Sequence, residues 1–575
     1  MIISIIFVII EIFFLINLMK FKLTDKTVAV CTQIPLAFVF IMAFHAMIAG
    51  LLSLVHININ LYSIGFFDLI MSIVIFSKYK RTGTQKYEIS GKNYLFYILL
   101  TIGVLLFGLV LFGRNLEIHF WSVDASAHYG MARHVVKNQS FNTNLYFSAL
   151  NNGIAMMIAK SFIGEQYLYK VFIIMELWDL WIAGALFYGF INQVKQDKGI
   201  KSIIITAIYL LGYPLYAIIF GFSYFGAAIS LIVATMCWIE KKECSEIDNK
   251  LFLVFANLLL FSLFVCYTYL VPVMFGTLFL LIFIDYLKKT GKILTKEMLL
   301  EQLKVFLLPC CLGMIFSISN LKELGAGGGI TNPGGCYFDL YSNFIVFSIF
   351  IGVGIYLTFK DRLFLSVHLL SALSIIFLVL LLVMNLHGKA SIYYVSKIYN
   401  VIWFCSFIYF FIGISFIFEK LQSIKLSILI SLMVSIILPL FINFSGVFSE
   451  PGYIRMNGIS LVPDIYSFNY SARMTSYITD EEIASYKYIS TTYGKNNEDI
   501  IAIGNEVNCG WFRAISSQNL SVSYEMDDLF NKIDKQVKYL YCMKSSFLVN
   551  ENTSLLENLG KIIYSDQFGF LIELD

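Results

Sequence analysis

Long uninterrupted apolar stretches constrain this chain more than any other feature. Residues 93–113 read NYLFYILLTIGVLLFGLVLFG, a run without a charged side chain. It is long enough to cross a bilayer as one helix, which takes about 20 apolar residues. Similar runs fill most of the 575 residues, and only 14% of the residues are charged, against about 25% in soluble domains. The sequence therefore predicts a polytopic α-helical membrane protein.

Length and apolarity of the runs predict about fourteen membrane spans. The expected spans lie near residues 1–19, 27–57, 61–77, 93–113, 166–192, 202–219, 226–240, 250–267, 270–286, 303–319, 342–358, 363–385, 398–418 and 425–446. The run from 250 to 286 is too long for one helix, and Pro272 in its middle predicts a tight hairpin. The first run has no basic leader and no small-residue cleavage site, so we interpret it as a retained span.

Basic residues alternate along the connecting loops and predict the orientation. Lys and Arg gather in the loops at 20–26, 78–92, 193–201, 240–250, 287–302, 359–362 and 419–425. Because cytoplasmic loops carry the excess of Lys and Arg, the remaining loops and both termini should lie outside the cytoplasm. The net charge of +3 is too small to suggest a nucleic-acid partner. We therefore expect a multi-pass cell-membrane protein.

The tail from residue 448 to 575 has the composition of a soluble domain. Its segment TDEEIASYKYISTTYG predicts a helix capped by Thr479, with Glu482 three residues later. EDIIAIG and KYLYCM predict short buried strands, so we expect a small extracytoplasmic α/β domain. Cys509 and Cys542 could form a disulfide there or remain two buried thiols. None of the ten cysteines shows zinc-site spacing, so no structural metal is expected.

An unusually polar segment, HFWSVDASAHYGMARHVVKNQSF, occupies residues 119–141 in an outer loop. It predicts a short interfacial helix with Asp124 at its start and His128 one turn later, followed by a second interfacial helix. Asp124 could be only the N-cap of that helix, a position that Asp fills well. It could equally be a functional carboxylate held near the membrane surface. The sequence alone leaves both interpretations open.

A second outer segment, HGKASIYYVSKIYN, contains Lys389 and Lys397 with Tyr393 and Tyr394 between them. Tyr393 and Lys397 are four residues apart and share one helix face. The alternative is an ordinary aromatic belt with a snorkelling lysine. The glycine-rich GAGGGITNPGG lacks the Lys-Ser/Thr ending of a phosphate-binding loop, so we expect a mobile loop over the entrance to a site.

Glu176 and Asp179 lie within a predicted span, where carboxylates are costly unless they face a cavity or the bundle interior. They could line a site or simply pair with other groups inside the bundle. The sequence does not choose between these roles.

Several of these segments together resemble the GT-C superfamily of integral-membrane glycosyltransferases. The resemblance is carried by WSVDASAHYGMAR, an Asp followed by His and Tyr in an outer loop, by LLGYPLYAIIFGFSYFGAAISLI and VCYTYLVPVMFG in the spans, and by EEIASYKYISTTYGKNNEDIIAIG in the tail. It extends from about residue 93 to the end. The chain departs from the family in having three extra spans before the aspartate loop. The implied parts are N-terminal helices at 1–92, a catalytic core at 93–447 and an outer domain at 448–575.

The resemblance implies an activity. GT-C enzymes transfer a sugar from a polyprenyl-phosphate donor to an acceptor hydroxyl outside the cytoplasm, here of a cell-envelope glycan or lipid. Their loop aspartate is the general base, which matches Asp124, and YYxxK is similar to a phosphate-side segment of some bacterial families. The implied substrate-binding residues are His128, Arg133, Lys389, Tyr393, Tyr394 and Lys397. No cofactor beyond the lipid-linked donor is implied, although a divalent metal could assist. The alternatives are a transporter or flippase and a polysaccharide polymerase for lipid-linked glycans.

Overall fold

The computed structural model describes most of the chain. The described residues are 1–23, 27–88, 91–120, 122–140, 147–194, 200–243, 247, 249–293, 295–324, 329–331, 347–361, 363–420, 455–456, 459–460, 478–494, 500–516, 521–533 and 537–574. The predicted span at 425–446, most of the glycine-rich loop and the predicted boundary at residue 448 lie outside them.

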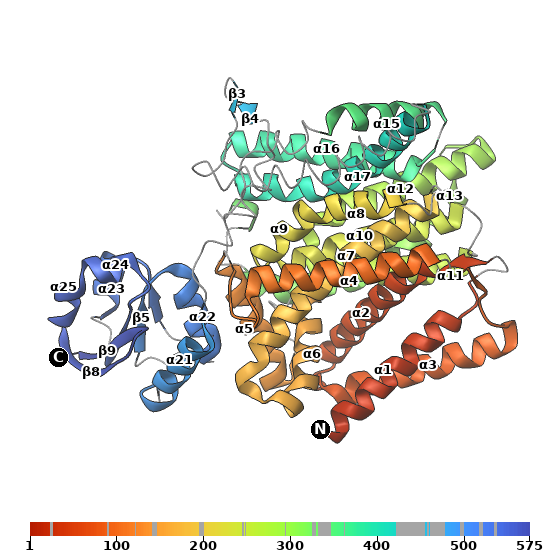
Figure 1. Ribbon diagram of the computed structural model, residues 1–575. Coiled ribbons are helices and arrows are strands. Elements are labelled where there is room, and N and C mark those ends of the chain that lie inside the picture. Colours follow the sequence, from red (N-terminus) through yellow and green to blue (C-terminus); the bar gives the residue numbers. More distant parts are fainter. Residues whose placement is uncertain are drawn as a thin grey trace.

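A bundle of helices makes up the part of the protein before residue 421 (Figure 1). Its helices are α1 (Ile2–Lys20), α2 (Val30–Leu54), α3 (Leu61–Thr82), α4 (Gly91–Phe112), α5 (Asp124–Asn138), α6 (Phe147–Ile163), α7 (Leu168–Val194), α8 (Ile200–Leu211), α9 (Tyr213–Ile219), α10 (Ser223–Glu243), α11 (Asn249–Tyr267), α12 (Val271–Thr290), α13 (Lys296–Leu324), α15 (Ser348–Lys360), α16 (Leu365–Leu386) and α17 (Ile392–Lys420). Short 3-10 turns lie at Glu165–Tyr167, Thr268–Leu270 and Gly329–Thr331, and two-residue strands at β1 (Val28–Ala29), β2 (Tyr87–Glu88), β3 (Arg455–Met456) and β4 (Ile459–Ser460).

The predicted class, a polytopic helical membrane protein with a small strand-containing C-terminal region, is confirmed, but the count of fourteen spans is not. Among the described residues, ten helical segments are long and apolar enough to cross a membrane, or eleven if α8 and α9 form one span bent by 44°. One of the ten, Asn249–Thr290, contains two helices. The predicted span at 342–358 appears as α15, which has 13 residues. A helix of that length rises only about 20 Å, less than the thickness of the hydrocarbon core.

The hairpin predicted at Pro272 is present. The chain turns through Thr268–Leu270, and Pro272 lies in the first turn of α12, where its missing N–H has no helical partner to lose. Residues near the end of α12, including Asp285 and Lys288, line the same hollow as Asn249 at the start of α11. The two helices therefore run in opposite directions.

The bundle has two distinct ends. Backbone hydrogen bonding from Ile59 to Gln139, at 2.6 Å, places the α2–α3 connection beside the end of α5. We call this the α5 end. Phe21 and Thr84 pair near β1 and β2, beyond the other tips of α1 and α3, and Thr32 in the first turn of α2 contacts Gly189 near the end of α7. We call this the opposite end.

The C-terminal region (residues 478–574) forms a five-stranded sheet with order β6-β5-β7-β9-β8. Its elements are α21 (Asp480–Thr492), β5 (Ile500–Ile503), α22 (Glu506–Ser516), β6 (Ser521–Ser523), α23 (Met526–Ile533), β7 (Tyr539–Met543), α24 (Phe547–Glu551), α25 (Thr553–Glu557), β8 (Gly560–Ser565) and β9 (Gly569–Leu574). β6, β5 and β7 are parallel, and β9 is antiparallel to both of its neighbours. Thr479 caps α21 by accepting the backbone N–H of Glu482, as predicted.

The two cysteines of this region are free, so a Cys509–Cys542 disulfide is excluded. Cys509 lies on α22 and packs against Met543, with the sulfur atoms 3.9 Å apart. Cys542 belongs to the separate apolar cluster that also holds Leu540 and Phe570. The two thiols are thus held in different cores, and each behaves as a small buried apolar side chain.

The C-terminal region lies against the α5 end of the bundle (Figure 1). Ile118 and Ile478 form an antiparallel backbone bridge, with N···O distances of 2.9 and 3.3 Å. Lys170 at the start of α7 forms a 2.7 Å ion pair with Asp480 at the start of α21. These contacts join residues more than 300 positions apart in the sequence. They hold the C-terminal region against the bundle, with α22 next to α5.

Candidate active site

Asp124 is the first residue of α5 and is not its N-cap. The cap position is Val123, and the helix has no side-chain capping hydrogen bond. The backbone N–H of Asp124 itself donates to Ser122 Oγ at 3.1 Å. The interpretation of Asp124 as a structural cap is therefore wrong, and its half-buried carboxylate is left for another role.

The surroundings of Asp124 raise its pKa above the ordinary value. Burial is the largest cause, and the carboxylate of Glu506 on α22 adds to it. The ammonium of Lys397 and a hydrogen bond with Ser122 act in the opposite direction. A carboxylate with a raised pKa binds a proton more readily than a solvated one, which suits a general base.

Lys397, in the first turns of α17, is buried in a cage of aromatic rings. Its Nζ lies 3.8 Å from the ring centroid of Tyr393 and between 4.8 and 5.4 Å from four more. We define the aromatic cage as these five residues: Phe222, Tyr224, Tyr267, Tyr393 and Tyr394. Ring faces attract a cation, more strongly where water is excluded. The cage therefore holds a positive charge inside the bundle, at the end where Asp124 lies.

Tyr224, near the start of α10, joins the cage to α5. Its hydroxyl accepts a hydrogen bond from Lys397 Nζ and lies 3.1 Å from the hydroxyl of Tyr393. Its ring centroid lies 4.7 Å from that of His128, one helical turn after Asp124. Burial, helped by the charge of Lys397, lowers the pKa of His128 to about 3. His128 is therefore neutral at physiological pH and can contribute hydrogen bonds but not charge.

Of the predicted substrate-binding residues, the structure gathers Lys397, Tyr393, Tyr394 and His128. Lys389 instead is exposed at the tip of the turn between α16 and α17. Phe222, Tyr224 and Tyr267 were not predicted to contribute. They stand at helix ends in GFSYFG and VCYTYL, and an aromatic residue at such a position ordinarily indicates only a membrane-interface belt.

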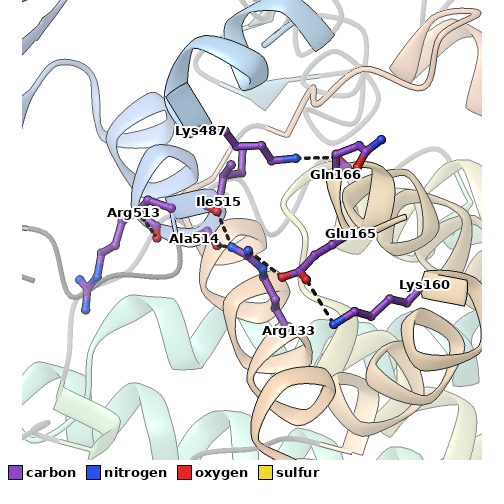
Figure 2. A network of polar contacts seen from close by, with 9 residues as sticks. Arg133, Lys160, Glu165, Gln166, Lys487, Arg513, Ala514 and Ile515 are labelled. Carbon is purple, nitrogen blue, oxygen red and sulfur yellow. Dashed lines mark hydrogen bonds and ion pairs between the residues drawn. The ribbon is translucent and has the colours of Figure 1, made fainter. Parts of the chain in front are cut away.

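Arg133 of α5 lies where the bundle meets the C-terminal region (Figure 2). Its Nη1 donates to the backbone carbonyls of Ala514, at 3.0 Å, and Ile515, at the end of α22. Its Nη2 forms a 3.1 Å ion pair with Glu165. A guanidinium at a helix C-terminus is favourable because the last carbonyls are partly negative. These contacts give Arg133 a docking role, and its predicted substrate-binding role stays a prediction.

Glu176 and Asp179 of α7 line a cavity together with Ser223, Tyr209 and Asn400. Phe222 belongs both to this cavity and to the aromatic cage. Of the two roles left open by the sequence, the structure supports the lining of a cavity. A separate group, Glu11, His45 and Asp68 on α1, α2 and α3, is the one set in the described part of the chain that could hold a metal ion.

Comparisons with known proteins give a distant likeness. No protein-family model matches the sequence, and no curated protein does. The chain is similar to the crystal structure of ArnT from Cupriavidus metallidurans in the apo state, with a TM-score of 0.49 and 10% identity, covering 84% of this chain and 98% of that one. The same protein bound to undecaprenyl phosphate gives a TM-score of 0.48, with the same identity and coverage.

Proposed function

We propose that this chain is a membrane glycosyltransferase of the GT-C type. It would move a sugar from a polyprenyl-phosphate donor to a cell-envelope glycan or lipid acceptor, on the outer side of the membrane. One observation carries the proposal: a buried lysine ammonium, held by aromatic rings, stands close enough to Asp124 to influence its pKa. A cation at the end of an apolar bundle suits a phosphate that carries a lipid tail.

In this reaction Asp124 acts as the general base. It takes the proton of the acceptor hydroxyl while the hydroxyl oxygen attacks the anomeric carbon of the sugar. The bond between that carbon and the phosphate oxygen breaks, and its electron pair stays on the phosphate. General-base assistance of this kind contributes about two to four orders of magnitude in rate. The half-buried position of Asp124 beside α22 supports this role, because partial desolvation raises its affinity for the proton.

Lys397 stabilises the leaving group. Negative charge on the polyprenyl phosphate grows as the glycosidic bond breaks, and a positioned cation favours that change. The hydroxyls of Tyr224 and Tyr393, 3.1 Å apart in the cage, can donate hydrogen bonds to the same oxygens. The neutral His128 beside Tyr224 can orient the substrate through a hydrogen bond.

The test is donor turnover by the purified full-length protein. It would be incubated with a panel of polyprenyl-phosphate sugars and candidate envelope acceptors, and release of free polyprenyl phosphate would be followed. Glycosylated acceptor formed in step with free polyprenyl phosphate supports the proposal. Movement of intact donor across a vesicle membrane, without cleavage for any sugar in the panel, would instead indicate the flippase alternative and overturn it.

A further inference from the structure

A compact group of metal-ligand side chains joins the three N-terminal helices, well apart in sequence from the candidate active site. Glu11 lies on α1, His45 on α2 and Asp68 on α3. His45 Nε2 is 3.2 Å from Glu11 Oε1 and 3.3 Å from Asp68 Oδ2. One donor atom from each residue lies within 4.8 Å of the other two. No residue of this group takes part in the aromatic cage.

The spacing of these atoms matches a metal coordination shell. Nitrogen and oxygen ligands lie about 2.0–2.2 Å from a tetrahedral zinc ion, so neighbouring ligand atoms are about 3.3 Å apart. The distances of 3.2 and 3.3 Å from His45 Nε2 to the two carboxylate oxygens agree with that separation. The three side chains could therefore hold an ion with little movement of the helices.

The burial of Asp68 is the second indication of a ligand. Its side chain is fully buried, and in the described part of the chain neither carboxylate oxygen accepts a hydrogen bond that satisfies the usual geometry. His45 Nε2 carries at most one proton and also faces Glu11, so it cannot satisfy both carboxylates. A buried carboxylate without adequate partners is costly unless it binds a proton or a cation.

Charge balance favours a divalent cation. Ionised Glu11 and Asp68 with a neutral His45 carry two negative charges, which one divalent ion neutralises inside an apolar bundle. Without the ion, neutrality requires two added protons, one on His45 and one on a carboxylate. Mixed imidazole and carboxylate donors suit Zn²⁺ and Mn²⁺, and the lack of a thiolate disfavours Cu(I).

We propose that Glu11, His45 and Asp68 bind one divalent transition-metal ion of the Zn²⁺ or Mn²⁺ class, which ties α1, α2 and α3 together. The role is structural, and it is independent of the proposed glycosyl transfer. Glu11 keeps 21% of its side chain exposed, whereas His45 keeps 7% and Asp68 none, so Glu11 is the most accessible of the three ligands.

The test is calorimetric titration of Zn²⁺ into the full-length protein in detergent, purified without a histidine tag and treated with a chelator. We expect one ion per chain, bound more tightly at higher pH because the ion competes with protons for its ligands. Co²⁺ in the same site should show the visible absorption of tetrahedral coordination. The wild-type unfolding temperature should rise when Zn²⁺ is added.

Three variants make the test specific. Asp68→Asn and the more accessible Glu11→Gln should each weaken Zn²⁺ binding by more than about 100-fold, since loss of a ligand exceeds the effect of a supporting residue. Ser72→Ala is the matched control, because Ser72 lies on the same helix in a separate polar contact, 2.6 Å from Asn17 Nδ2. It should bind as the wild type does. The proposal would be overturned if the wild type did not bind Zn²⁺ stoichiometrically, or if both ligand variants bound it as tightly as the wild type.

Discussion

At the scale of single residues, Lys397 gives the sharpest test of the phosphate site. Lys397→Met keeps the length of the side chain among the five rings but removes the charge. We expect polyprenyl phosphate to bind more weakly by about 1.5–3 kcal/mol, the contribution of a hydrogen bond to a charged group. This corresponds to roughly 10- to 150-fold in Kd, measured by direct binding in nanodiscs.

Lys389→Ala is the control for this measurement. Lys389 is an exposed lysine only eight residues earlier, so its loss changes the net charge equally but leaves the cage intact. Unchanged affinity in Lys397→Met, or equal losses in both variants, would remove the cage from the donor site.

Asp124 should show its role in both rate and pH dependence. Asp124→Asn should lower transfer by about 100- to 10,000-fold, because the amide cannot accept the proton. Since burial raises the pKa of Asp124 in the folded protein, its ionised form costs folding free energy at neutral pH. The variant should therefore unfold at the same temperature as the wild type or a higher one. Transfer within a few-fold of the wild-type rate would exclude the general-base role.

The acidic side of the pH–rate profile tests the general-base role of Asp124 independently. Only the ionised form of Asp124 acts as a base, so turnover should rise with pH as that group loses its proton. The exposed carboxylate of Glu506 raises the pKa of Asp124. Glu506→Gln should therefore move the acidic limb to lower pH while leaving the plateau rate unchanged. A profile that does not move would show that another group controls the limb.

At the scale of elements, Arg133 connects α5 to α22 and so holds the C-terminal region over the site (Figure 2). Arg133→Ala should weaken this docking by about 1.5–3 kcal/mol, because two part-buried backbone carbonyls lose a charged donor. Glu165→Ala should cost under about 1 kcal/mol, since that carboxylate is half-exposed. Faster amide hydrogen exchange in α22 is the measurement, with the exposed Lys137→Ala of the same helix as control.

Local patterns predicted the elements well, because they depend on neighbours in sequence. The apolar runs, the turn at Pro272 and the Thr479 cap all follow from side chains a few residues apart. The contacts between elements could not be predicted in the same way. The charge of Arg133 indicated a substrate-binding residue, yet its partners are the carboxylate of Glu165 and two backbone carbonyls about 380 positions later.

The residues of the candidate site also divide into those that local sequence indicates and those that only the fold brings together. Asp124 and the Tyr393–Lys397 pair could be proposed from the sequence because ionisable groups beside membrane spans are costly and therefore informative. Tyr224 and Tyr267 gave no such signal, since tyrosines at helix ends are common in membrane proteins. The Glu11, His45 and Asp68 group was missed because its members are spread over three helices, 34 and 23 residues apart, without the short spacing of a metal motif.

At the scale of the whole molecule, the proposed glycosyl transfer requires that Asp124, Lys397 and the C-terminal region share one side of the membrane. The structure brings Asp124, Lys397 and α22 to the α5 end. The basic residues around Lys288 and Lys289 of α12 lie with the start of α11, away from that end. Because Lys and Arg gather on the cytoplasmic side, the α5 end should face outward.

Single cysteines at exposed positions test this orientation in intact cells. Ala127→Cys, Lys389→Cys and Thr491→Cys lie at the α5 end and should react with a membrane-impermeant thiol reagent. Thr84→Cys and Thr290→Cys lie at the opposite end and should react only after the cells are permeabilised. The unmodified protein, whose own exposed Cys311 lies within an apolar helix, measures the background. The reverse pattern would place Asp124 in the cytoplasm, where the proposed outer-side transfer cannot occur. Labelling at 127 without labelling at 389 would divide the site between the two sides, because Asp124 and Lys397 could then not act on one substrate.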